Sequence, residues 1–257
     1  DGGWLWPIGS VLIKNFSFDF QGGSGPERRP VETRVMKRFP DGRWYYWSYQ
    51  WNDQGTDATL LEDSVERYLT VFNQPQPTRY VYPSEMSCRA CHGYHAEGVL
   101  GPTAIQLDLE ISTQGTVRRQ LDLLSELGIV ERQQLPVSGL VNPANETAPI
   151  EARARSYLHG NCAHCHHPGG YAPPDVLMDL RITTPLRDAQ LCGAEVDYSS
   201  GTAHWRIAPG NLEESDLWQR FTSNGLWRMP VIGTVQHDPL GEAVIKEWIE
   251  SLDECPP

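Results

Sequence analysis

The first 85 residues alternate between apolar and polar positions with the period of two that is typical of β-strands. The runs richest in β-branched and aromatic residues are Val11–Phe18, Val31–Arg38, Trp44–Trp51, Glu66–Phe72 and Arg79–Tyr82. Turn-forming residues at Gln21–Pro26 and Pro40–Gly42 separate the first three runs. The second of these turns predicts a hairpin. We therefore expect an antiparallel sheet of four or five strands in the N-terminal part.

After residue 85 the apolar residues recur with the helical period instead. The segments with this pattern are Thr116–Leu127, Ile150–His159, Asn211–Phe221 and Asp238–Leu252. Gly128 is a plausible C-terminal stop for the first of them. Asn211 and Glu214 match the N-cap and N3 positions of a capping box for the third. Pro239 stands at the first position of the fourth, where proline is favoured.

The last predicted helix has the clearest apolar stripe. Its members are Leu240, Val244, Ile245, Trp248, Ile249 and Leu252. Because Val137–Asn145 has the composition of a linker, we place a domain boundary near residue 148. The expected fold class is α+β. A β-rich N-terminal domain with a helical tail covers residues 1–148, and an all-α domain covers residues 149–257.

Length and charge narrow the class of protein. The 257 residues suit one large domain or two modest ones. With 33 acidic and 21 basic residues the formal net charge is −12, which nucleic-acid phosphates would repel. No apolar run approaches the ~20 residues that cross a bilayer, and Asp1–Gly3 does not begin a secretory leader. We therefore expect neither a nucleic-acid-binding protein nor a transmembrane segment in this chain.

Four of the six cysteines and two histidines form two copies of the pattern C-x-x-C-H. The residues are Cys88, Cys91 and His92 in the first copy and Cys162, Cys165 and His166 in the second. This pattern attaches a c-type haem: the two thiols bond to the porphyrin vinyl groups, and the histidine ligates the iron. Chance would give roughly 0.004 matches in a chain of this composition. The sequence therefore predicts two covalently attached haem c groups.

Other uses of the C-x-x-C spacing fit less well. A zinc ribbon places its two C-x-x-C pairs about 15–20 residues apart. Here the first motif ends at residue 92 and the second begins at residue 162. A thioredoxin-like dithiol explains one C-x-x-C, but not a histidine after both. Zinc and a disulfide are the alternatives that remain open at each motif.

The C-terminal hundred residues resemble the class I cytochrome c fold. In that fold a helix carries C-x-x-C-H, a later Met-Pro loop supplies an axial thioether, and a C-terminal helix packs across the first. Met229, in Trp227–Pro230, matches the loop, which implies that its sulfur is the second axial ligand of the second haem. Pro168 matches the proline whose carbonyl accepts the N–H of the ligating imidazole, here His166. The alternative role for Met229 is buried packing.

The resemblance supplies no sixth ligand for the first haem. The candidates are Met36, His159, Met178, His204 and His237. His159 falls two helical turns before His166, although a surface or supporting role fits it as well. Met36 lies in a predicted strand, where sheet packing is the simpler role. An open coordination position is the remaining alternative.

Cys192 and Cys255 are left over, on either side of the Met229 loop. Cytochrome c maturation takes place outside the cytoplasm, where disulfides persist, so a bridge between these two is the economical interpretation. Two unpaired thiols are the alternative. By loop-closure entropy the bridge would stabilise the fold by about 4 kcal/mol.

As a whole, the chain resembles a family of bacterial periplasmic dihaem c-type cytochromes with a β-rich N-terminal part and a C-terminal cytochrome c domain. The matching stretches are Pro7–Phe16, Glu32–Arg34, Tyr49–Asp53, Thr56–Ala58, Pro83–Ser84, Tyr157–His166, Leu191–Cys192, Ala208–Gly210 and Arg228–Pro230. The resemblance implies export to the periplasm. Family members carry further sequence upstream of Asp1, so we expect a processed or partial form.

Electron transfer is the leading functional interpretation, with the second haem exchanging single electrons and the first relaying them. An acidic chain suits transient docking on redox partners, a donor and an acceptor, that present basic surfaces. One alternative is a dihaem redox enzyme, peroxidase-like or acting on a small nitrogen or oxygen species at an open first haem. The other is a cytochrome subunit of a dehydrogenase or of a larger assembly.

Overall fold

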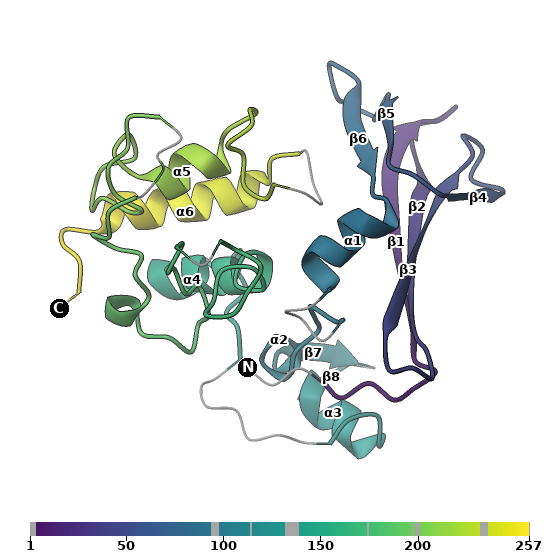
Figure 1. Cartoon of the computed structure of the whole chain (residues 1–257), viewed down its shortest axis with the longest axis horizontal. Coiled ribbons are helices and arrows are strands. Elements are labelled where there is room, and N and C mark those ends of the chain that lie inside the picture. Colours follow the sequence, from purple (N-terminus) through teal and green to yellow (C-terminus); the bar gives the residue numbers. More distant parts are fainter. Residues whose placement is uncertain are drawn as a thin grey trace. The chain divides into compact units, whose positions relative to one another are not determined.

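The computed structural model describes residues 4–93, 98–113, 115–131, 139–173, 175–196, 198, 201–231 and 236–256. Most contacts fall within two compact units (Figure 1). The sheet unit comprises Leu5–Gly98 and Pro230–Gln236. The helical unit comprises Val99–Met229 and His237–Pro257, together with Asp1–Trp4. Each unit has buried apolar residues of its own.

The sheet unit is built on a four-stranded antiparallel sheet. Its strands, in the order in which they pair, are β1 (Val11–Gln21), β2 (Pro26–Arg38), β3 (Trp44–Trp51) and β4 (Ala58–Leu61). Both predicted turns are confirmed, since Gln21 pairs with Pro26 across the first and Arg38 with Trp44 across the second. The second turn contains Gly42 at φ +79°, a conformation that favours glycine.

The last two predicted strands form a separate hairpin. β5 (Val65–Leu69) and β6 (Thr78–Tyr82) make a two-stranded sheet of their own. The expectation that they extend the main sheet is therefore wrong. The place beside β3 is taken by β4, because a turn in which the N–H of Asn52 donates to the carbonyl of Asp57 returns the chain at once.

The segment that follows the sheet unit is more mixed than predicted. It contains α2 (Ala104–Leu107), β7 (Glu110–Thr113), β8 (Thr116–Arg119) and α3 (Gln120–Glu126). The predicted helix over 116–127 is wrong at its start, because Thr116–Arg119 pairs with β7. Leu121 is buried as the helical pattern requires, whereas Leu127 is exposed.

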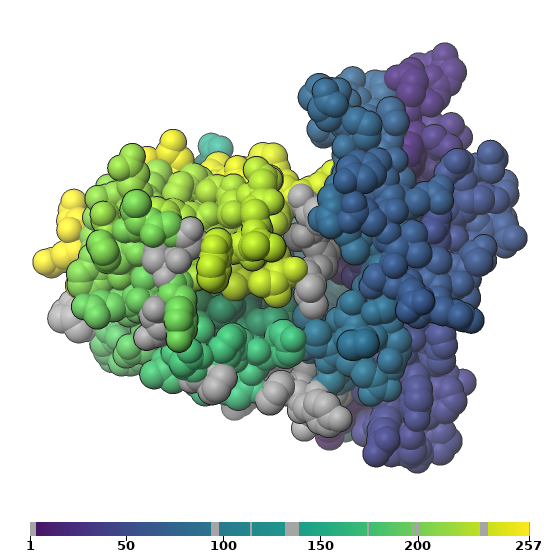
Figure 2. All heavy atoms as spheres, turned by 45° about the horizontal axis from the view of Figure 1, so that its top comes forward, coloured from purple at the N-terminus to yellow at the C-terminus, as the bar shows by residue number. Residues whose placement is uncertain are grey.

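The core of the helical unit lies between α4 (Ile150–Asn161) and α6 (Pro239–Ser251), and both of these predicted helices are confirmed. Trp248 and Ile249 of α6 have no exposed surface. The helices approach so closely that a Cβ on Gly241 would lie 2.3 Å from the Tyr157 ring, so only glycine fits there. In Figure 2 the green and yellow segments of this unit lie against one another at the surface.

The two predicted N-caps have different outcomes. Asp238 caps α6 as expected, since its Oδ1 accepts the N–H of Leu240 (3.1 Å). Asn211 does not begin a helix. Its side chain accepts two N–H groups within a turn, and α5 (Asp216–Phe221) starts only after that turn. Leu240, predicted to face the core, is 41% exposed because it lies in the first turn of α6.

Cys192 and Cys255 are joined by a disulfide, which confirms the predicted bridge. Cys192 follows the short 3-10 helix η1 (Leu186–Asp188), and Cys255 follows the end of α6. The bridge therefore links the C-terminus of the last helix to the loops of the same unit.

The chain is thus a mixed α+β protein with antiparallel sheets and few helices. Within the described ranges, no helix is long and apolar enough to span a membrane. The contacts divide the chain between Gly98 and Val99, whereas the domain boundary near residue 148 stays a prediction. Residues 137 and 138 of the predicted linker lie outside the described residues.

Candidate functional site

The first C-x-x-C-H motif lies on α1 (Glu85–His92), immediately after β6. Ser84 caps this helix, since its Oγ accepts the N–H of Ser87 (3.3 Å). Cys88 and Cys91 are three positions apart, so helical geometry places both thiols on one face. The histidine of the motif is the last residue of the helix.

The end of α1 is attached to β3. The Tyr46 hydroxyl donates to the backbone carbonyl of His92 (2.7 Å), and the centroids of the two rings lie 5.6 Å apart. The Arg89 guanidinium is 6.0 Å from the Tyr46 ring centroid, at the limit of cation–π range. The position of the motif therefore depends on the main sheet.

A backbone carbonyl orients the His92 ring. Its Nδ1 lies 2.9 Å from the oxygen of Gly98. Because a carbonyl only accepts, Nδ1 carries the proton and Nε2 presents its lone pair. Gly98 has φ +94°, and a Cβ there would lie 1.9 Å from the Trp44 ring, so glycine is required. Burial lowers the pKa of His92, which favours the neutral form that metal ligation needs.

A fully buried carboxylate supports the same face of the sheet. The two oxygens of Glu32 accept hydrogen bonds from Arg34 (2.8 and 2.9 Å), Ser48 (2.7 Å) and Tyr80 (2.6 Å). Ser48 shares its face of β3 with Tyr46, which contacts α1. Burial and then the charge of Glu32 raise the pKa of Tyr80, so its hydroxyl stays a donor. Sequence reasoning missed this network, because a glutamate in an alternating strand suggests a solvent-facing position.

The second motif follows α4 directly. Cys162 caps the helix, and its N–H donates to the carbonyl of Leu158 (2.8 Å). The N–H groups of Cys165 and His166 then donate to the carbonyl of Cys162 (3.1 and 3.0 Å), which closes a turn. Burial raises the pKa of the Cys162 thiol to about 12, so it stays protonated at neutral pH.

The His166 ring has an orphaned nitrogen. Its Nδ1 is buried and has no hydrogen-bond partner in the part of the chain that the structure describes. The predicted partner, the carbonyl of Pro168, lies 2.9 Å from Nδ1 of His167 instead. Because His167 is adjacent to Pro168 in the chain, its imidazole lies within hydrogen-bond distance of this carbonyl. Burial, above all, lowers the pKa of His166 to about 4, and the ring is neutral.

Met229 lies in the loop between α5 and α6, in the same unit as the second motif. Its N–H donates to the carbonyl of Arg220 (3.0 Å) in the last turn of α5, and its side chain is half-buried. The Arg220 side chain binds Asp216 (2.5 Å) and lies 5.3 Å from the Trp227 ring centroid. These contacts tie the loop to α5. The role of Met229 as an iron ligand stays a prediction.

The other candidates for the first haem lie in different surroundings. Met36 pairs with Tyr46 in the register of β2 and β3, so it shares the sheet face that contacts α1. Met178 packs against the core of the helical unit, and His204 is exposed. Both ring nitrogens of His237 have polar neighbours within hydrogen-bond distance. Of the candidates, Met36 alone belongs to the sheet unit with the first motif.

His159 has a structural role in α4. It is buried, and its Nδ1 accepts the N–H of Ile182 (3.1 Å). A neutral imidazole that accepts at Nδ1 carries its proton on Nε2, which leaves no lone pair for a metal. This tautomer argues against His159 as the sixth ligand of the first haem. Burial, above all, lowers the pKa of the ring to about 4.

We expect His159 to make the fold sensitive to acid. Its pKa is about 4 when folded and ~6.5 when unfolded. The unfolded chain therefore binds more protons between these values, and the free energy of unfolding falls by ~3 kcal/mol as the pH drops from ~6.5 to ~4. Denaturant titrations across this range measure the effect. His159→Asn keeps an acceptor for Ile182 but does not titrate; an equal acid loss in that variant would refute this assignment.

None of the four motif cysteines forms a disulfide with a described residue. Among the described residues the disulfide Cys192–Cys255 is the only one. Burial raises the pKa of Cys88 as it does that of Cys162. In the described ranges no three histidine, cysteine, aspartate or glutamate side chains are grouped to hold a metal ion.

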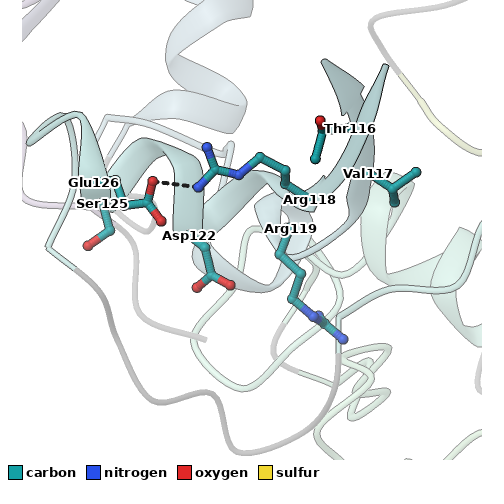
Figure 3. A pocket seen from close by; sticks show the side chains of 7 residues that line it. All are labelled: Thr116, Val117, Arg118, Arg119, Asp122, Ser125 and Glu126. Atoms are coloured by element: carbon teal, nitrogen blue, oxygen red, sulfur yellow. Dashed lines mark hydrogen bonds and ion pairs between the residues drawn. The ribbon is translucent and has the colours of Figure 1, made fainter. Parts of the chain in front are cut away.

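A surface pocket of about 480 Å³ lies elsewhere, between β8 and α3. Figure 3 shows Arg118 joined to Glu126 there, with Arg119 turned away from both. Arg119 binds Asp108 instead (2.6 Å). Because each arginine already has a carboxylate partner, the pocket has no spare charge for an anion, and it contains no motif residue.

No family model, curated protein or solved structure matches this chain.

Proposed function

We propose that this protein is a c-type cytochrome that carries two covalently attached haems and transfers single electrons between periplasmic redox partners. The observation that carries the proposal is the pair of C-x-x-C-H motifs, Cys88–His92 and Cys162–His166. In each motif the two thiols and the imidazole belong to one helical turn or one tight turn.

The histidines suit a haem iron. His92 is neutral and presents Nε2, because its Nδ1–H donates a hydrogen bond to the carbonyl of Gly98. This is the arrangement in which a carbonyl fixes the tautomer of an axial imidazole. Burial, above all, lowers the pKa of His166 to about 4, which favours the neutral imidazole that an iron ligand needs.

The pKa values of the motif thiols argue against the main alternative use of C-x-x-C, a redox-active dithiol. A redox-active dithiol needs a thiol whose pKa is lowered by nearby positive charge or a helix N-terminus. Here burial raises the pKa of both Cys88 and Cys162; Cys88 lies in the middle of α1, and Cys162 is the C-cap of α4. Buried, protonated thiols fit covalent attachment better than disulfide exchange.

The helical unit supports the likeness to class I cytochrome c. α4 leads into the motif, α6 is the last helix, and the two are packed together. Tyr157 and Gly241 form the close crossing. The Met229 loop immediately precedes the segment that leads into α6, as the methionine loop does in that fold.

A bound haem would supply a centre that gains and loses one electron. His92 and His166 would hold the irons, and the four motif cysteines would hold the porphyrins. The Gly98 carbonyl would orient His92, and the apolar core around Trp248 would keep water from the second site, which raises the potential of a haem. Met229 would add a thioether, which raises it further.

The acidic chain supports a partner with a basic docking surface. At a formal charge of −12, encounter with such a partner is fast at low salt and slows as salt rises. A cytochrome subunit of a dehydrogenase would bind the same kind of surface more tightly.

One observation favours a second candidate, a redox enzyme at the first haem. The surroundings of α1 are polar: Lys14 and Arg34 are cross-strand partners, and Glu32 lies beside them. The positive charges of Arg34 and Lys14 both reach His92. A polar surface of this kind suits a small anionic or oxygen-containing substrate better than an apolar pocket does.

Carbon monoxide distinguishes the two candidates. We expect the optical spectrum of the dithionite-reduced protein to show no immediate change when the gas is added, since both irons of a relay are six-coordinate and the gas must wait until a ligand leaves. An immediate change in about half of the haem absorbance would mean that the first iron has an open position. That result would contradict the simple relay and favour the enzyme.

Met229→Ala tests the ligand of the second haem. We expect both haems to stay attached while one midpoint potential falls, on the order of 0.1 V, because axial ligands span ≈ 0.8 V of haem potential. Redox titration with optical detection measures the change. Met178→Ala, a methionine packed against the core of the same unit, is the matched control. Unchanged potentials in Met229→Ala would reject Met229 as a ligand.

A further inference from the structure

The Met229 loop has a second anchor besides α5. Nη1 of Arg228 lies 3.1 Å from Nε2 of His237 and also donates to the carbonyl of Ser223 (3.1 Å). His237 itself is bound at Nδ1 by Glu242 (2.5 Å), in the first turn of α6. A continuous set of hydrogen bonds therefore runs from α6 to the residue before Met229.

The carboxylate fixes the direction of these bonds. Glu242 only accepts, so Nδ1 of His237 carries the proton. Nε2 is then an acceptor, and the Arg228 guanidinium, which only donates, is its natural partner. The Asn224 side-chain amide lies 2.8 Å from the same Nε2. Since amide oxygen and nitrogen exchange by a half-turn, this amide can turn its NH2 group toward Nε2 and share the lone pair with Arg228.

The anchor is itself firmly placed. Asp238, next to His237, caps α6 and accepts a hydrogen bond from the Tyr157 hydroxyl of α4 (3.0 Å). Tyr157 packs against Gly241 at the crossing of the two helices. The helix that leads into the second motif and the Met229 loop are therefore connected through the start of α6.

We propose that His237, oriented by Glu242, is a positioning residue that holds the Met229 loop in place through Arg228. The proposal rests on the proposed function, because it assumes a haem at Cys162–His166 with Met229 as its ligand. His237 does not touch the iron. His237 instead affects how often the Met229 thioether dissociates from the iron.

The rate of carbon monoxide binding to the reduced protein reports this directly, because the gas can bind the second iron only while Met229 is away. We expect His237→Ala to raise the rate about tenfold, the effect of losing one partly buried hydrogen bond of ordinary strength. The absorption band of methionine-ligated ferric haem should weaken in parallel. His237→Gln, whose amide can accept from Arg228 and donate to Glu242, should restore most of the wild-type rate.

A matched control removes a charge from the same helix without touching the loop. Lys246→Ala breaks an exposed pair with Glu250 (3.9 Å) and should leave the rate unchanged. A rate in His237→Ala within twofold of wild type, with two haems still attached, would overturn the proposal. If His237→Ala does not fold, Glu242→Ala gives the same readout with an expected increase of about threefold, and an unchanged rate there would equally overturn it.

Different results would show that the proposed function itself is wrong. A wild-type protein without haem, or a Met229→Ala variant with an unchanged carbon monoxide rate, would remove the ligand itself. A large increase of the carbon monoxide rate in Met229→Ala, together with an unchanged rate in His237→Ala, would refute only the positioning role of His237.

Discussion

Replacing Cys88 and Cys91 with alanine is expected to halve the covalently bound haem. These two thiols lie on one face of α1, and nothing else in the sheet unit matches the attachment pattern. The second motif belongs to the other unit, so its attachment should be unaffected. The mass of the denatured protein measures the result, which should fall by one haem.

Two variants make this result specific. Cys162→Ala with Cys165→Ala should also remove one haem, and the two pairs together should remove both. Cys192→Ala with Cys255→Ala removes the disulfide and should leave two haems attached. Two haems on the Cys88→Ala, Cys91→Ala protein would show that the first motif is not an attachment site.

Trp248→Ala is expected to destabilise the helical unit by about 3–5 kcal/mol. The side chain has no exposed surface and belongs to the core between α4 and α6. Its Nε1 makes no hydrogen bond to any described residue. The cost is therefore lost packing and the cavity left behind, and it is large against a typical domain stability of 5–15 kcal/mol.

Trp227→Ala is the matched control, since that ring is half exposed. Its loss should cost less than about 1 kcal/mol, mainly its cation–π contact with Arg220. Guanidinium unfolding followed by circular dichroism compares the two variants with the wild type. Similar unfolding midpoints for Trp248→Ala and the wild type would mean that α4 and α6 do not form the core described here.

The local signals in the sequence predicted much of the fold. Alternation and turn residues predicted β1, β2 and β3 with both turns between them and the hairpin of β2 and β3, and Asp238–Pro239 predicted the start of α6. The predictions failed where a competing local structure, a hairpin or a turn, formed in place of the expected helix. Thr116–Arg119 has helical periodicity but pairs with β7, and Asn211 binds the backbone of a turn rather than of a helix.

The candidate site was predictable where it is local. A C-x-x-C-H motif brings its thiols and imidazole together by spacing alone. The spacing of the motif does not predict which groups from other segments contact it. The Glu32 network, the Gly98 carbonyl on His92 and the pairing of Pro168 with His167 all depend on how loops and strands meet. For the same reason spacing could not rank Met36 and His159, which the sheet register and a tautomer now distinguish.

The central claim is that two haems are attached covalently. The most direct test is the intact mass of the protein, produced in a bacterial host that exports it and matures c-type cytochromes, then denatured and separated from free haem. We predict the mass of the 29.0 kDa polypeptide plus two haems. The mass of the polypeptide alone, with no haem bound, would contradict the account.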